Sequence, residues 1–282
     1  MSEHAAVAPA APTGVGLVCR NNHFLLRRLH SLSGIIPIGA FVAFHLFTNM
    51  QMLLGSFQHE VNWIHSQPAL LWMEIFVLWL PIAFHAVLGL IYTFTGKPNS
   101  VAYGYMANWR YTLQRVTGVL ALIFILLHVA ILRWRWNLLG WYTPFFSKGL
   151  YDHHVVDLAH YSTSVALNQT AVLVLYIIGV LSVVYHFANG LWTAAITWGL
   201  TVSVAAQRRW GYVCAVVFVA LAAFASAALV GAVTYKDKAP QVQQQAYAAM
   251  AADYQAGKLN FESIERIANT PAGSTLSLKD AR

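Results

Sequence analysis

Five apolar runs, each long enough to cross a lipid bilayer, constrain the fold of this 282-residue chain more than any other feature. A spanning helix needs roughly 20 apolar residues, and backbone polar groups inside the bilayer must be satisfied within the protein. The runs lack the two-residue alternation that is typical of barrel strands. We therefore predict an all-α integral membrane protein, folded as a bundle of five transmembrane helices. The predicted helices cover about residues 29–54, 71–95, 112–136, 169–198 and 209–235.

The composition supports this prediction and suggests three parts. Charged residues make up only 10% of the chain, whereas soluble proteins average roughly 25%. The net charge of +7 comes from basic residues scattered near the ends of the runs, which indicates membrane topology and no nucleic-acid patch. We predict a flexible cytoplasmic arm over residues 1–22, the membrane domain over residues 23–235, and a polar extracytoplasmic tail over residues 236–282.

Basic residues near the helix ends predict the orientation, because cytoplasmic loops of membrane proteins carry the excess of Lys and Arg. Eight lie before the first run or at the loops on the same side, and three lie in the loops on the opposite side. We therefore place the N-terminus in the cytoplasm. The eight are Arg20, Arg27, Arg28, Lys97, Arg110, Arg115, Arg208 and Arg209, and the three are Arg133, Arg135 and Lys148.

Four histidines lie well inside the apolar runs, where ionisable residues are usually functional and face the bundle interior. Counted along the helices, His45 and His128 lie roughly 24 Å from the cytoplasmic end, and His85 and His186 roughly 15–18 Å. The four therefore form two levels with two imidazoles each. Two imidazoles that face each other can fill both axial positions of a haem iron. A hydrogen bond to a neighbouring helix is the alternative for any one of them.

Each of these histidines has a glycine near its own helical face, four residues after it or about three turns before it. We expect such glycines to let a flat macrocycle approach the backbone, and helix–helix packing of small residues is the alternative. The pairs are His85 with Gly89, His186 with Gly190, His45 with Gly34, and His128 with Gly118. In addition, Pro81 leaves the carbonyl of Val77 without its helical partner and is expected to bend the second helix.

Together these residues resemble one family, the single-chain, five-helix, di-haem cytochrome b subunits of succinate:quinone oxidoreductases, which include succinate dehydrogenase and fumarate reductase. The resemblance runs from about Phe24 to Ala232. It is carried by Arg27–Leu32 with Gly34 and Pro37, His45-Leu46, Glu74–Phe76, Leu80-Pro81, His85-Ala86, Asn108-Trp109, Leu113–Gly118, His128-Val129, His186-Phe187, Asn189–Trp192, Trp198-Gly199 and Gln207-Arg208.

The resemblance implies that the first four helices bind two b haems, the proximal one through His85 and His186 and the distal one through His45 and His128. It implies a bacterial cytoplasmic membrane, with a flavoprotein and an iron–sulfur subunit docked on the cytoplasmic side. Quinone, often menaquinone, would react on the distal side. The dicarboxylate chemistry would occur on the flavoprotein, so this chain would contribute no catalytic residue. Val184 stands where some fumarate reductases have a glutamate, which argues against a proton route through the fourth helix.

Several polar residues are secondary candidates. At the inner end, Arg28, His30, Ser31 and Arg115 are expected to contact haem propionates, and anchoring by positive charge is the alternative for the arginines. At the outer end, Glu74 could exchange the proton that quinone chemistry requires, and Asn49 and Gln51 could line a quinone pocket. A third group, His153, His154, Asp157 and His160, is interpreted as a solvated turn in preference to a metal site.

From this resemblance we expect the chain to be the anchor of a succinate dehydrogenase that passes electrons between the iron–sulfur subunit and membrane quinone. The same anchor in a fumarate reductase would work in the quinol-oxidising direction. Two further hypotheses are the cytochrome b anchor of a hydrogenase or formate dehydrogenase, and a haem-free transporter that uses the histidines for packing or proton relay. Lipid and quinone are further predicted partners, and a higher oligomer of the complex is a further hypothesis.

Overall fold

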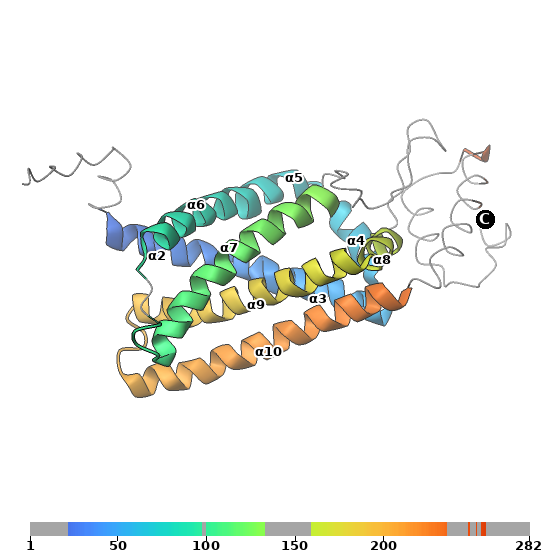
Figure 1. Cartoon of the computed structure of the whole chain (residues 1–282). Coiled ribbons are helices and arrows are strands. Elements are labelled where there is room, and N and C mark those ends of the chain that lie inside the picture. Colours follow the sequence, from blue (N-terminus) through green and yellow to red (C-terminus); the bar gives the residue numbers. More distant parts are fainter. Residues whose placement is uncertain are drawn as a thin grey trace, which may run out of the picture.

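The computed structural model describes residues 22–97, 100–132 and 159–235, together with residues 248, 252 and 255–257. Five helical segments within these residues are long and apolar enough to cross a membrane. They lie side by side along one common direction (Figure 1). The predicted all-α fold with five membrane helices is therefore confirmed. The segments are His23–Leu54, Leu70–Thr95, Met106–Leu132, Thr170–Thr197 and Val204–Thr234.

The first two segments are each divided by a stretch of π-helix, a wider helical turn that holds one extra residue. The first segment comprises α2 (His23–Ser33), η1 (Gly34–Gly39) and α3 (Ala40–Leu54), and the second comprises α5 (Leu70–Met73), η2 (Glu74–Trp79) and α6 (Leu80–Thr95). Pro37 lies inside η1, and Pro81 is the second residue of α6, in the turn that follows η2. Because proline has no N–H to donate, it breaks the regular ladder at both places.

The other three segments are single helices, α7 (Met106–Leu132), α9 (Thr170–Thr197) and α10 (Val204–Thr234). We call the end of the bundle where α2, α7 and α10 begin the inner end (Figure 1). Two short helices, α4 (Phe57–His65) and α8 (Ala159–Leu167), lie at the opposite, outer end. The first, third and fifth segments begin earlier than predicted, because polar residues at the inner end continue each helix beyond its apolar run.

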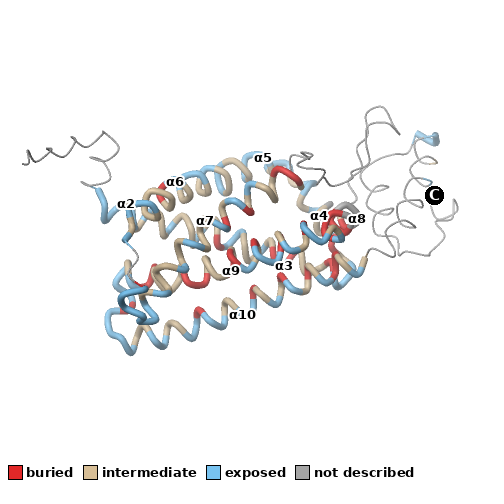
Figure 2. Tube along the Cα trace, viewed as in Figure 1, coloured by how far each residue is buried: buried red, intermediate tan, exposed pale blue. Residues whose placement is uncertain are grey.

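Packing is close where small residues line the interfaces. Helix α10 runs along α3, α7 packs against α9, and α2 packs against α6. At Gly231 in α10, an added Cβ would lie 2.5 Å from the carbonyl carbon of Met52 and 2.8 Å from Cα of Leu53, so only glycine allows this approach. Figure 2 shows buried residues inside the bundle and exposed residues on its outward faces. Those faces carry large apolar side chains such as Leu80 and Val87, which suits contact with lipid.

The predicted end of the third helix, at residue 136, lies outside the described residues. The same holds for all of the predicted arm except Asn22, and for most of the predicted tail.

Candidate functional site

The four membrane histidines lie in two facing pairs. His85 on α6 faces His186 on α9 with ring centres 6.1 Å apart and planes at 88°. His45 on α3 faces His128 on α7 with ring centres 5.8 Å apart and planes at 86°. The depth count along the helices predicts the same two pairs. Each metal–imidazole bond is about 2 Å long, so rings on opposite sides of one metal have centres roughly 6 Å apart.

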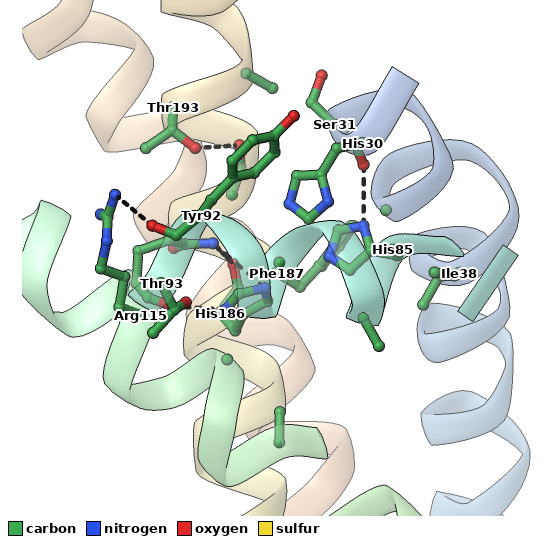
Figure 3. Close-up of a pocket in the computed structure, with 18 of the residues that line it drawn as sticks. His30, Ser31, Ile38, His85, Tyr92, Thr93, Arg115, His186, Phe187 and Thr193 are labelled. Carbon is green, nitrogen blue, oxygen red and sulfur yellow. Dashed lines mark hydrogen bonds between the residues drawn. The ribbon is translucent and has the colours of Figure 1, made fainter. Parts of the chain in front are cut away.

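The inner pair lies in a cavity of about 410 Å³ between the first four long segments, which we call the inner cavity. Figure 3 shows His30, His85 and His186 directed into this space. Its size is within the roughly 300–1,000 Å³ of typical cofactor sites. All four glycines singled out in the sequence line it, namely Gly34, Gly89, Gly118 and Gly190.

Two of these glycines face histidines other than those with which the sequence pattern pairs them. A Cβ added at Gly34 would lie 2.5 Å from Cε1 of His85, and one at Gly118 would lie 2.8 Å from Cε1 of His186. The sequence pattern pairs these glycines with His45 and His128 on their own helices. The structure differs because each glycine lies at the same depth in the bundle as a histidine on a neighbouring helix. The histidine on the glycine's own helix is about three turns further along.

Hydrogen bonds fix the tautomers of the inner pair. Nδ1 of His85 donates to the backbone oxygen of His30 at 2.9 Å, and Nδ1 of His186 donates to the backbone oxygen of Gln114 at 3.0 Å. A carbonyl oxygen can only accept, so Nδ1 carries the proton and Nε2 keeps its lone pair. Metal-binding histidines are usually oriented by such a bond at the other ring nitrogen. In the outer pair, Nδ1 of His128 lies 3.1 Å from the hydroxyl of Tyr176.

The polar rim of the inner cavity differs in part from the prediction. His30, Ser31 and Arg115 line it, and their contact with haem propionates stays a prediction. Arg28 is not among the described lining residues; its guanidinium lies 4.2 Å from the ring centre of Phe24 and 5.2 Å from that of Trp198. Arg27 lines the cavity in its place. Consecutive helical residues point in directions about 100° apart, so Arg27 and Arg28 face different surroundings. A contact of Arg28 with a propionate stays a prediction.

Two buried nitrogens at this rim lack a hydrogen-bond partner within the described part of the chain. They are Nε of Arg115 and Nδ1 of His30. Other nitrogens of the Arg115 guanidinium donate to the backbone oxygens of Tyr111 and Tyr92, at 3.1 and 3.4 Å, which holds the group in place. Buried donors normally have acceptors. The rim is therefore suited to an acidic or otherwise accepting group inside the cavity.

The comparison with curated proteins decides the family. The chain is 40% identical over 203 residues to the succinate dehydrogenase cytochrome b558 subunit of Bacillus subtilis (strain 168). The alignment covers 71% of this chain and 93% of that protein. The chain belongs to the succinate dehydrogenase cytochrome b558 family. No family model and no solved structure matches it.

In this member of the cytochrome b558 family, the predicted quinone residues lie apart from the inner cavity. Glu74 begins η2 and is half-buried. The side chain of Asn49 donates to the backbone oxygen of His45 at 2.7 Å, and that of Gln51 accepts from the Ser56 hydroxyl at 2.8 Å. None of the three is among the described residues that line the cavity. Their role in quinone binding stays a prediction.

The sequence predicts that the group of His153, His154, Asp157 and His160 forms a solvated turn, and this prediction is wrong for His160. This residue is buried in α8, with its ring stacked on Tyr235 at 3.8 Å and Nε2 3.4 Å from the backbone oxygen of Gly231. Burial lowers the pKa of His160 to about 4. The described residues contain no group of three or more His, Cys, Asp or Glu that could hold a metal ion. The other members of the group, His153, His154 and Asp157, lie outside the described residues.

Sequence reasoning also missed Gln114 and Asn189 as contacts of the site. The side-chain amide of Gln114 donates to the backbone oxygen of His186 at 3.0 Å, and Asn189 donates to Oε1 of Gln114 at 2.7 Å. A signal for Gln114 was present in the chain. It precedes Gly118 by four residues, as His30 precedes Gly34.

Proposed function

We propose that this chain holds two b haems and passes electrons between an iron–sulfur subunit of succinate dehydrogenase and membrane quinone. The observation that carries the proposal is the pair formed by His85 and His186. They face each other across the inner cavity with Nδ1 of each bound to a backbone carbonyl, so Nε2 of each keeps the lone pair that would bind one iron. The name of the Bacillus subtilis relative, a cytochrome b558 subunit, supports a haem at such a site.

The residues of the inner cavity fit a haem in three respects. Gly34, Gly89, Gly118 and Gly190 leave its walls without side chains where a flat ring would lie. The unpartnered Nε of Arg115 would meet a propionate as a charge-assisted hydrogen-bond donor. His30 and Ser31 line the same wall. For the second haem we propose His45 and His128 as ligands, with Tyr176 orienting His128.

A bound haem b supplies reversible one-electron transfer. Two histidines of this chain would hold each iron, and a haem held in this way would serve electron transfer and not the binding of oxygen or a substrate. The buried apolar side chains around the two pairs exclude water from this path, among them Leu46, Phe124 and Val184.

The partners follow from the family. A succinate dehydrogenase oxidises its dicarboxylate on a flavoprotein, and the iron–sulfur subunit would dock at the inner end, nearest His85 and His186. We place that end in the cytoplasm because of the basic residues at the helix ends. At the outer end, Glu74 would exchange a proton with the quinone, which we propose to be menaquinone.

The experiment that tests this function is a haem count on the purified complex. We expect two haems per chain with the absorption spectrum of low-spin, bis-histidine iron. Replacing His85 or His186 by alanine should remove one haem, and replacing His45 or His128 should remove the other. A count near zero or near one would refute the proposal, as would loss of the same haem in all four variants. Succinate-dependent reduction of menaquinone and of ubiquinone would then identify the acceptor.

A further inference from the structure

The two inner histidines are held by the same backbone arrangement on two different helices. In each case a carbonyl oxygen accepts the Nδ1–H of the histidine, and a glycine four residues later makes room for the ring. On the first segment these residues are His30 and Gly34, which hold His85, and the Ser33 hydroxyl also donates to the His30 oxygen. On α7 they are Gln114 and Gly118, which hold His186, whereas the Thr117 hydroxyl donates to the backbone oxygen of Leu113 at 2.6 Å.

In each arrangement, the side chain of the first residue also contacts the histidine. The ring of His30 stacks on that of His85, with centres 4.0 Å apart and planes at 15°. Gln114 has no ring, and its amide nitrogen instead donates to the backbone oxygen of His186 at 3.0 Å and lies 3.5 Å from Nε2 of that residue. Gln114 therefore contacts His186 through both its backbone and its side chain.

Asn189 determines which way the Gln114 amide points. It lies three residues after His186 on α9 and is only 6% exposed. Its amide nitrogen donates to Oε1 of Gln114 at 2.7 Å and to the backbone oxygen of Arg110 at 3.2 Å. Because Oε1 accepts from Asn189, the amide nitrogen of Gln114 must be the atom that faces His186. The buried network thus joins α7 to α9 with defined donors and acceptors.

We propose that Gln114 and Asn189 are positioning residues for His186. They fix the plane of its imidazole relative to that of His85, which lies at 88° to it, and they hold its Nδ1–H on a strong acceptor. The bond to the carbonyl raises the basicity of Nε2 and so tunes the iron that it would bind. This inference rests on the proposed function, since it assigns these residues to the haem between His85 and His186.

The test uses the complete purified complex carrying Asn189→Leu, which has the same branched shape and number of heavy atoms and cannot donate to Gln114. We call the proposed haem between His85 and His186 the inner haem and the one between His45 and His128 the outer haem. We expect shifts in the EPR signal and in the reduction potential of the inner haem, with those of the outer haem unchanged. Loss of a residue that orients a metal ligand typically weakens metal binding by roughly 10–100-fold. The inner haem should therefore also transfer faster to a haem-accepting protein. The matched control is Tyr176→Phe, which removes the partner of His128 and should shift only the outer haem.

The inference fails if Asn189→Leu leaves the EPR signal, reduction potential and retention of the inner haem unchanged. It also fails if the variant shifts the EPR signals and potentials of both haems equally. Two bound haems in that variant would leave the proposed function intact, whereas a wild-type complex without haem would refute the proposed function itself. Should Asn189→Leu assemble poorly, Gln114→Met decides the question. Methionine fills a similar volume and introduces no charge, but it has no amide. A packing role alone therefore predicts wild-type behaviour for this variant, whereas the positioning role predicts the same shifts of the haem between His85 and His186.

Discussion

His30 supports His85 in two ways at once. Its backbone oxygen accepts the Nδ1–H of His85 at 2.9 Å, and its ring lies parallel to the ring of His85 with centres 4.0 Å apart. Gly89 leaves room for this stack, because an added Cβ there would lie 3.3 Å from Cε1 of His30. His30, which is predicted to contact haem propionates, therefore also supports His85, a proposed iron ligand. The proposed site depends on such second contacts as much as on its ligands.

The glycines that face the inner histidines give the first prediction. Gly34→Ala and Gly118→Ala would each push a methyl group against an imidazole ring, at 2.5 and 2.8 Å. The ring must tilt, which weakens its bond to the carbonyl. We expect each variant to lose inner haem while keeping outer haem, measured by haem content and EPR. Gly104→Ala, with no atom within 4 Å of the added Cβ, is the control and should keep both haems.

The two neighbouring arginines of α2 give the second prediction. Arg27 lines the inner cavity, whereas Arg28 lies over Phe24 and Trp198. Removing a positive charge near a haem favours its oxidised form. Arg27→Gln should therefore lower the reduction potential of the inner haem in a redox titration, and Arg28→Gln should change it less. An equal or larger shift in Arg28→Gln would show that the cavity lining has been assigned to the wrong arginine.

The contact between α10 and α3 gives the third prediction. Gly231→Ala would place its methyl group 2.5 Å from the carbonyl carbon of Met52, which is backbone and cannot rotate away. Overpacking of this kind costs about 1–3 kcal/mol. We expect a lower thermal unfolding temperature in detergent for Gly231→Ala. Gly211→Ala in the same helix, where the nearest atom lies 3.6 Å from the added Cβ, should be neutral or stabilising.

The fourth prediction concerns pH at the outer end. The pKa of His160 falls from its ordinary 6.5 to about 4 because the residue is buried against Tyr235. The folded state therefore keeps His160 neutral, while the undocked state takes up a proton below about pH 6.5. The docking of α8 should be strongest above that pH and weaken toward pH 4, by up to about 3 kcal/mol.

The hydrogen-exchange protection of α8 at pH 8 and pH 5, corrected for the slower intrinsic exchange at low pH, measures this effect, and lower protection is expected at pH 5. Tyr235 stays neutral over this range, since burial raises its pKa to about 12. His160→Phe keeps the stacked contact but cannot be protonated, so its corrected protection should differ little between the two pH values. Equal pH dependence in that variant would assign the effect to another group.

The sequence allowed a prediction of the helices and of the two histidine pairs, because both depend on distance along a helix axis. The partners of Gly34 and Gly118 could not be predicted, since they depend on how neighbouring helices cross. The choice between Arg27 and Arg28 depends on the rotation of α2 within the bundle. His160 illustrates a third limit, because its burial requires Tyr235, which lies 75 residues further along the chain.

The π-helical stretch η1 explains a difference in spacing between two otherwise similar helices. Gly34 precedes His45 by eleven residues across η1, whereas Gly118 precedes His128 by ten along the regular helix α7. One extra residue in a regular helix would turn everything beyond it by about 100°. The wide turn absorbs that residue, so His45 still faces His128. Deleting one residue from η1 should therefore be tolerated better than deleting one from α7, because it would convert the first helix to the regular winding of its counterpart.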